Sequence, residues 1–181
     1  MVISADDGCA SDLRLFGLAR KYNIPITFYW PVEWHSLAYE KEYQPLRYSD
    51  ALMISKSAEI GAHTITHRLL TKIPLNEAYY EIDQSKIILE KMFGKKITKF
   101  APPRGYTNDN LTKFTLNRFQ SQRLTKADNL VHIHPDSGAN DNKPWREAIN
   151  KKTTELFCHS HELDRFDMWE ELEEYLEATR S

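Results

Sequence analysis

The sequence is poor in cysteine and has no long apolar run. Its two cysteines, Cys9 and Cys158, are too few for a disulfide framework and lack the CxxC spacing of paired zinc ligands, so we interpret them as free interior thiols. No stretch approaches the roughly 20 apolar residues of a membrane-spanning helix. The N-terminus lacks the basic start and apolar stretch of a secretory signal, and we therefore expect a cytoplasmic protein without a membrane span.

An excess of charge of one sign is also missing. The 24 basic and 26 acidic residues are spread along the chain and give a formal net charge of −2. Because no basic stripe offers a footprint for phosphates, we expect no nucleic-acid partner. At 181 residues, of which 41% are apolar, the chain is long enough for one substantial core, and we expect a single domain over residues 1–181.

Strand-like and helical patterns alternate along the chain. Strands are predicted at 2–4, 26–30, 59–63, 97–101, 130–133 and 154–159, and helices at 11–22, 48–57, 75–93, 111–119 and 166–178, with a polar loop at 136–144. Such alternation predicts an α/β fold with a parallel sheet. In folds of this class the carboxyl ends of the strands and the loops after them carry the chemistry.

Two adjacent carboxylates and a glycine follow the first predicted strand. Gly8 permits a sharp turn, and the side chains of Asp6 and Asp7 point in different directions, so one can bind a metal while its neighbour stays free. An ordinary Asp-Gly turn, with Asp7 capping the next helix, explains these three residues equally well when they are taken alone.

A pair of histidines follows the third predicted strand. His63 and His67 converge on one metal if the chain makes a single turn between them, although surface or capping histidines are the better explanation of the pair taken alone. Two imidazoles and the Asp7 carboxylate would leave a position open for water, whose pKa the metal lowers toward about 7. Zinc is the favoured divalent ion, with cobalt or nickel as alternatives.

Other polar residues at the predicted strand ends are candidates for acid–base chemistry. With the second aspartate on the metal, Asp6 can accept a proton from the bound water as a general base. His159, at the end of the last predicted strand, can protonate a leaving amine, and a histidine that supports the sheet is the alternative. We expect His161 to point elsewhere, and we interpret His132 and His134 as structural.

Three segments, in this order, resemble motifs of the polysaccharide deacetylase family, the NodB-like carbohydrate esterases of family four. They are residues 4–8, 27–29 and 59–67. The resemblance covers nearly the whole chain and implies a distorted (β/α) barrel. It also implies a metal-dependent enzyme that removes N-acetyl groups from an amino sugar or polysaccharide by attack of a metal-bound water. The family's base falls on Asp6, and its metal ligands fall on Asp7, His63 and His67.

The third family motif departs from its usual pattern in this chain. Residues 100–105 resemble it, but Ala101 stands where many members carry an arginine that braces the catalytic aspartate. We hypothesise that Arg123 or Arg104 replaces this arginine near Asp6, because a carboxylate without such a partner would bind its proton differently. The resemblance further implies that the backbone amide of Arg104 donates to the oxyanion, a role that tolerates a changed side chain.

The last part of the chain also resembles the family. Residues 156–159 are similar to the family's leucine–histidine motif, which implies His159 as the acid, and residues 159–164 resemble a short-chain branch of the family. The fourth motif, an aspartate and a tryptophan that tune the acid histidine, has only a loose candidate at 141–145.

Two alternatives to a carbohydrate deacetylase stay open. The metal trio does not specify the acyl group, so the same site could hydrolyse a formyl or cyclic amide. Ala101 and the missing fourth motif also permit a carbohydrate-binding protein with a degenerate site. Four aromatic residues near predicted strand ends are candidates for stacking on sugar rings, with core packing as the alternative for about half of them. They are Tyr29, Trp30, Trp34 and Tyr106.

Overall fold

The computed structural model describes residues 1–37, 43–125, 130–133 and 155–179. The strands in these residues are β1 (Val2–Asp6), β2 (Ile26–Trp30), β3 (Glu59–Ala62), β4 (Lys99–Phe100), β5 (Ser121–Gln122), β6 (Leu130–Ile133) and β7 (Glu155–Cys158). The α-helices are α1 (Asp12–Lys21), α2 (Tyr48–Ser55), α3 (Leu75–Phe93), α4 (Asp109–Arg118), α6 (Ser160–Arg165) and α7 (Trp169–Ala178). Three short 3-10 turns are η1 (Trp34–Ser36), η2 (Leu70–Lys72) and η3 (Pro103–Gly105).

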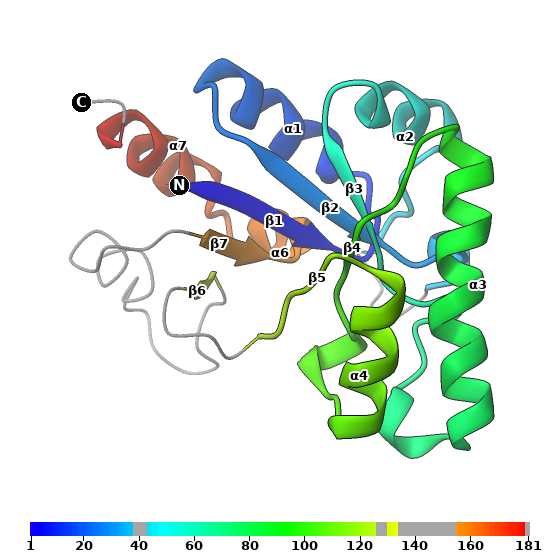
Figure 1. Ribbon diagram of the computed structural model, residues 1–181. Coiled ribbons are helices and arrows are strands. Elements are labelled where there is room, and N and C mark those ends of the chain that lie inside the picture. Colours follow the sequence, from blue (N-terminus) through cyan, green and yellow to red (C-terminus); the bar gives the residue numbers. More distant parts are fainter. Residues whose placement is uncertain (38–42, 126–129, 134–154, 180–181) are drawn as a thin grey trace.

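The strands form one curled parallel sheet in the order β5-β4-β3-β2-β1-β7-β6 (Figure 1). Helices lie against it, and α1 packs beside both α2 and α6. The predicted distorted (β/α) barrel is therefore confirmed. The central strand β2 is buried at all five positions, which is typical of a parallel strand covered on both faces.

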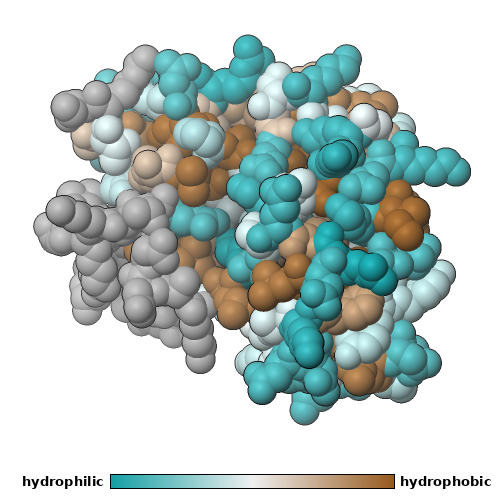
Figure 2. Space-filling model, viewed as in Figure 1, coloured by the Kyte–Doolittle hydropathy of each residue, from teal (hydrophilic) through white to brown (hydrophobic). Residues whose placement is uncertain are grey.

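The helices begin and end largely where the sequence predicts. α3 coincides with the predicted helix and ends at Gly94, whose φ of 64° is the left-handed conformation that glycine tolerates at a helix end. On the face shown in Figure 2, hydrophilic side chains cover much of the surface of α3 and α4, with smaller hydrophobic areas between them. None of the helices in the described ranges is long and apolar enough to cross a membrane.

Several details of the predicted elements are wrong. β4 is shorter than the predicted strand at 97–101, and no sequence pattern predicted β5 or α6, which have two and six residues. Elements this short cannot display a hydrophobic period. Both cysteines are buried and free, as predicted. The predicted loop at 136–144, His134 and the 141–145 candidate lie outside the described residues.

Three of the four aromatic residues proposed for sugar stacking are buried instead. Tyr29, Trp30 and Trp34 are at most 3% exposed, whereas Tyr106 is 58% exposed. The indole nitrogen of Trp30 donates to Asp12 at 2.8 Å, and that of Trp34 donates to a backbone carbonyl at 2.8 Å. Each indole thus has a partner for its polar atom in the interior, and Tyr106 remains as the stacking candidate.

Gly61 is required by the packing of β3 against β2. A Cβ built at Gly61 would overlap the ring of Tyr29, which is itself buried. We therefore predict that Gly61→Ala lowers the free energy of unfolding by about 1–3 kcal/mol, measured by urea denaturation. Gly17→Ala in α1 is the matched control, because nothing lies within 4 Å of a Cβ there and alanine is favoured over glycine in a helix by about 0.5–1 kcal/mol. Equal losses in the two variants would refute this role.

Candidate active site

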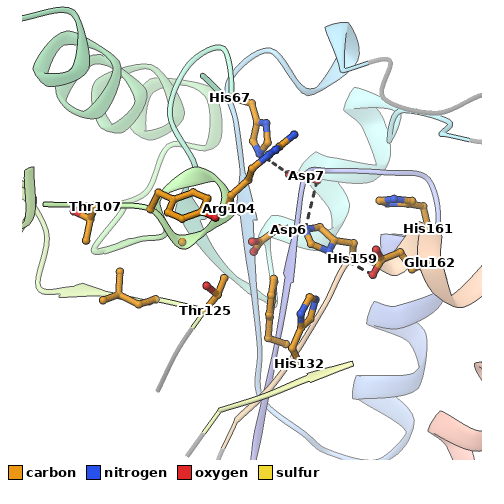
Figure 3. Close-up of a pocket in the computed structure, with 14 residues that line it drawn as sticks. Asp6, Asp7, His67, Arg104, Thr107, Thr125, His132, His159, His161 and Glu162 are labelled. Atoms are coloured by element: carbon orange, nitrogen blue, oxygen red, sulfur yellow. Dashed lines mark ion pairs between the residues drawn. The ribbon is translucent and has the colours of Figure 1, made fainter. Parts of the chain in front are cut away.

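The predicted site residues lie where neighbouring parallel strands end. Register places Asp6 of β1 beside Tyr29 of β2, and Ala5 beside Cys158 of β7. Residues that directly follow these strands, such as Asp7 and His159, therefore reach one region of space. A cavity of about 840 Å³ opens there (Figure 3). Of the predicted site residues, its walls include Asp6, Asp7, His67, Arg104 and His159.

The predicted metal ligands form a compact trio. Oδ1 of Asp7 lies 3.5 Å from Nε2 of His63 and 3.2 Å from Nε2 of His67, and the two Nε2 atoms are 3.1 Å apart. Atoms that bind a tetrahedral ion at about 2.0–2.1 Å lie about 3.3 Å from one another, so these separations suit one ion. Among the described residues, no group makes a well-formed hydrogen bond to the buried Asp7 Oδ1, a costly state that a cation would relieve.

The charge state of Asp7 suits a metal ligand. Burial raises the pKa of its carboxyl group, but the facing imidazoles of His63 and His67 outweigh burial and hold the pKa well below its usual range. Asp7 is therefore ionised at neutral pH, which is the form that binds a cation.

The ring of His63 is oriented by the backbone of the third motif. Its Nδ1 lies 2.7 Å from the carbonyl oxygen of Ala101. Since a carbonyl only accepts, Nδ1 carries the proton and Nε2 presents its lone pair to Asp7 and His67. His63 is 1% exposed and lies behind the cavity wall. The missing arginine side chain at Ala101 thus leaves this backbone contact intact.

A residue of α3 holds the turn between His63 and His67. Glu81 accepts hydrogen bonds from the amides of Ile65 and Thr66 at 2.8 and 3.0 Å and from the Thr66 hydroxyl at 2.6 Å. Thr64 and His67 have φ values of 71° and 59°, in the left-handed region that such side chains seldom adopt. The buried Glu81 carboxylate satisfies the turn's amides and so supports this unusual backbone.

Arg123 makes the contact that the sequence hypothesis assigned to Arg123 or Arg104. Its Nη2 donates to both carboxylate oxygens of Asp6, at 2.5 and 2.6 Å, and both side chains are buried. The guanidinium lies 4.0 Å from the ring centre of Phe157 and 4.8 Å from that of Tyr29. Arg104 instead lies in η3, where it is exposed on the cavity wall.

His159 faces the metal trio with one nitrogen and α6 with the other. Nε2 lies 3.7 Å from Oδ2 of Asp7, and Nδ1 lies 3.5 Å from Oε2 of Glu162. Burial lowers the pKa of His159, but the carboxylates of Glu162 and Asp7 outweigh burial and raise the pKa to about 9. The imidazole is therefore protonated at neutral pH, the state that a general acid requires.

Three further residues line the same cavity, and the sequence interpretation missed their positions. His161 was expected to point elsewhere and His132 to be structural, yet both lie on the wall together with Glu162. The reason is that α6 begins immediately after His159, so the chain turns back toward the cavity instead of continuing as a strand. The spacing of three residues between His159 and Glu162 was a usable signal once a helix there was suspected.

The Arg123–Asp6 pair is open to a stability test. Arg123→Ala leaves the Asp6 carboxylate buried without its partner, and we expect the free energy of unfolding to fall by about 3–5 kcal/mol. Adding Asp6→Asn removes that charge, so the double variant loses less than the sum of the single losses in a denaturation cycle. The control Arg104→Ala, on the exposed wall, changes stability by less than about 0.5 kcal/mol. Additive losses in the cycle would contradict this pairing.

Comparison with known proteins supports a single family. The profile of the polysaccharide deacetylases matches residues 1–118. A relative, the peptidoglycan-N-acetylmuramic acid deacetylase PdaC of Bacillus subtilis, is 37% identical over 59 residues. That match spans 33% of this chain and 13% of the relative, so the chain covers a small part of that protein's length.

Solved structures share the fold at low sequence identity. The structure of PdaC from Bacillus subtilis has a TM-score of 0.70 and 21% identity, and the match covers 99% of this chain and 82% of that one. The Bc1960 peptidoglycan N-acetylglucosamine deacetylase has a TM-score of 0.71 and 18% identity, with 98% and 81% covered. BA3943 from Bacillus anthracis, described as a pseudoenzyme, has a TM-score of 0.66 and 16% identity, with 96% and 60% covered. With the family profile matching well over half of its length, the chain belongs to the polysaccharide deacetylase family.

Proposed function

We propose that the chain is a metal-dependent deacetylase that removes N-acetyl groups from an amino sugar or polysaccharide. The observation that carries this proposal is the convergence of Asp7, His63 and His67 on one point beside the buried Asp6–Arg123 pair. Family membership supports the reaction class, and two of the structural neighbours are described as peptidoglycan deacetylases. The partner we propose is accordingly an N-acetylated carbohydrate.

The trio suits a divalent ion, with zinc favoured and cobalt or nickel as alternatives. Two imidazoles and one carboxylate are a donor set that zinc enzymes use, and they leave coordination positions open. When bound, such an ion lowers the pKa of a water and polarises a carbonyl oxygen.

Asp6 is the proposed general base. Its Oδ2 lies 3.8 Å from Nε2 of His63, so the carboxylate borders the trio without the close approach of Asp7. Arg123 fixes the orientation of this carboxylate, and its stacking on two rings limits its own movement. Asp6 can thus take a proton from a water that attacks the acyl carbon.

Two other residues assist the remaining bond changes. As the carbon–nitrogen bond breaks, His159 gives a proton to the departing amine, and its cationic state is suited to that transfer. The backbone amide of Arg104 is the proposed donor to the developing oxyanion. Arg104 lies in η3 with a φ of 58° and is one of the residues that line the cavity, which supports this role.

The degenerate-site alternative loses one of its two supports. It rested partly on Ala101, in place of an arginine near the base, and Arg123 from the neighbouring β5 edge makes that contact instead. The choice between an acetyl, formyl or cyclic amide depends on the substrate and is tested below.

Metal binding is the first test of this proposal. Loss of a ligand in Asp7→Asn, His63→Ala or His67→Ala should weaken zinc binding at the trio by more than the roughly 10–100-fold typical of changes outside the ligand shell. Asp6→Asn is the matched control and should retain zinc, because Asp6 is not a ligand. Equilibrium dialysis against zinc measures all four variants. Unchanged affinity in the three ligand variants would rule out the trio.

Acetate release from N-acetylated sugar oligomers is the second test. With zinc or cobalt added, the parent should release acetate, and Asp6→Asn and His159→Asn should each lower kcat by about 10²–10⁴-fold because each removes a proton-transfer group. Formylated sugars and cyclic amides belong in the same panel. Release of formate or ring opening without acetate would favour the other amides, and zinc binding without any turnover would favour a carbohydrate-binding protein.

A further inference from the structure

A second group of metal-binding side chains lies in the wall of the same cavity. One ligand atom from each of His132, His159 and Glu162 lies within 4.8 Å of the other two, the same limit that the first trio meets. His132 comes from β6 and Glu162 from α6, while His159 lies between β7 and α6. Figure 3 shows His132 and Glu162 close to His159, on the side of that ring that faces away from His67.

Regular structure holds these three residues in place. Pairing of β6 with β7 sets His132 beside Phe157, and their rings stack with centroids 4.4 Å apart. The His132 ring lies edge-on to that of His159, with centroids 5.8 Å apart. Glu162 is placed by the first turn of α6, three residues after His159. The set is thus positioned by a sheet and a helix, and each side chain is partly exposed to the cavity.

The donor set and its spacing suit a divalent ion. Two imidazoles and one carboxylate repeat the donor types of the first trio, and zinc accepts such a set. Nδ1 of His159 and Oε2 of Glu162 are 3.5 Å apart, close to the separation of about 3.3 Å expected for two atoms on one tetrahedral ion.

An ion at this position changes what His159 can do. A metal binds only a deprotonated imidazole nitrogen, so an ion on Nδ1 displaces the proton that faces Glu162. The ring is then no longer a protonated imidazolium, although Nε2 still faces Asp7 at 3.7 Å. A histidine held in this way keeps only the Nε2 proton of a neutral imidazole, and it gives that proton to a departing amine far less readily than an imidazolium does.

We propose that His132, His159 and Glu162 form a second divalent-cation site. Zinc bound there inhibits the hydrolysis, because it replaces a proton of His159 and so leaves this residue a far weaker acid. The inhibition rests on the proposed function, whereas the binding does not. The first trio keeps its own ion, since the two sets share no residue.

Binding stoichiometry tests the site without any assay of activity. Native mass spectrometry and equilibrium dialysis of the full chain against zinc should give two ions for the parent. Glu162→Gln and His132→Asn should bind one, and Asp7→Asn should keep the ion of the second site. Glu162→Gln preserves side-chain shape, so its circular dichroism should match the parent and separate lost binding from misfolding. His35→Ala, which removes an exposed histidine of η1, is the control and should still bind two. A parent that binds one ion would overturn the proposal.

Inhibition is then measured as acetate release at rising zinc concentration. Past the first equivalent, the parent rate should fall by about 10²-fold, the contribution expected of an acid catalyst. In Glu162→Gln this fall should disappear, whatever the variant's own starting rate. If the parent binds two ions and its rate does not fall, the inhibitory role is overturned, but the second binding site is supported. No acetate release at any zinc concentration would count against the proposed function, and the stoichiometry would still decide the second site.

Discussion

The contact between Arg123 and Asp6 determines how the rest of the site is organised. Two adjacent aspartates end a central strand, and both are buried, so their charges must be balanced within the protein. Arg123 balances Asp6, and the imidazoles of His63 and His67 face Asp7. Because each carboxylate has its own partner, the two neighbours in the sequence can take the different roles proposed for them, Asp7 as a metal ligand and Asp6 as the base beside it.

Both the register of the strands and strained backbone conformations position the proposed metal ligands. Parallel register brings the strand ends together, while Asp7, Thr64 and His67 all have positive φ values. Each such conformation costs on the order of 1–3 kcal/mol for a residue other than glycine. The strain lies at two of the proposed ligands and at Thr64 between the two histidines, and the hydrogen bonds to Glu81 hold the turn that contains Thr64.

Sequence patterns predicted the parts of the fold that repeat and missed the parts that depend on a few residues. α3 has enough residues to show a helical period, β2 is a run of β-branched and aromatic residues, and both were predicted with their observed bounds. The motif residues could also be found from the order of the strand ends. The choice of Arg123 over Arg104 could not, because it depends on the two-residue strand β5 beside β4. The positions of His132 and His161 were missed since they depend on β6 pairing and on the start of α6.

The proposed metal trio draws all three residues from the first 67 positions, whereas Arg123, His132, His159 and Glu162 all come from the last third of the chain. The proposed ligands and the proposed base Asp6 thus lie in one segment, whereas the partner of that base and the proposed acid lie in another. Mutations confined to the later segment would remove the proposed acid and the partner of Asp6 and leave the metal trio in place. A lineage with this architecture could lose the proposed reaction through a few substitutions and keep the ion site, without rebuilding the sheet.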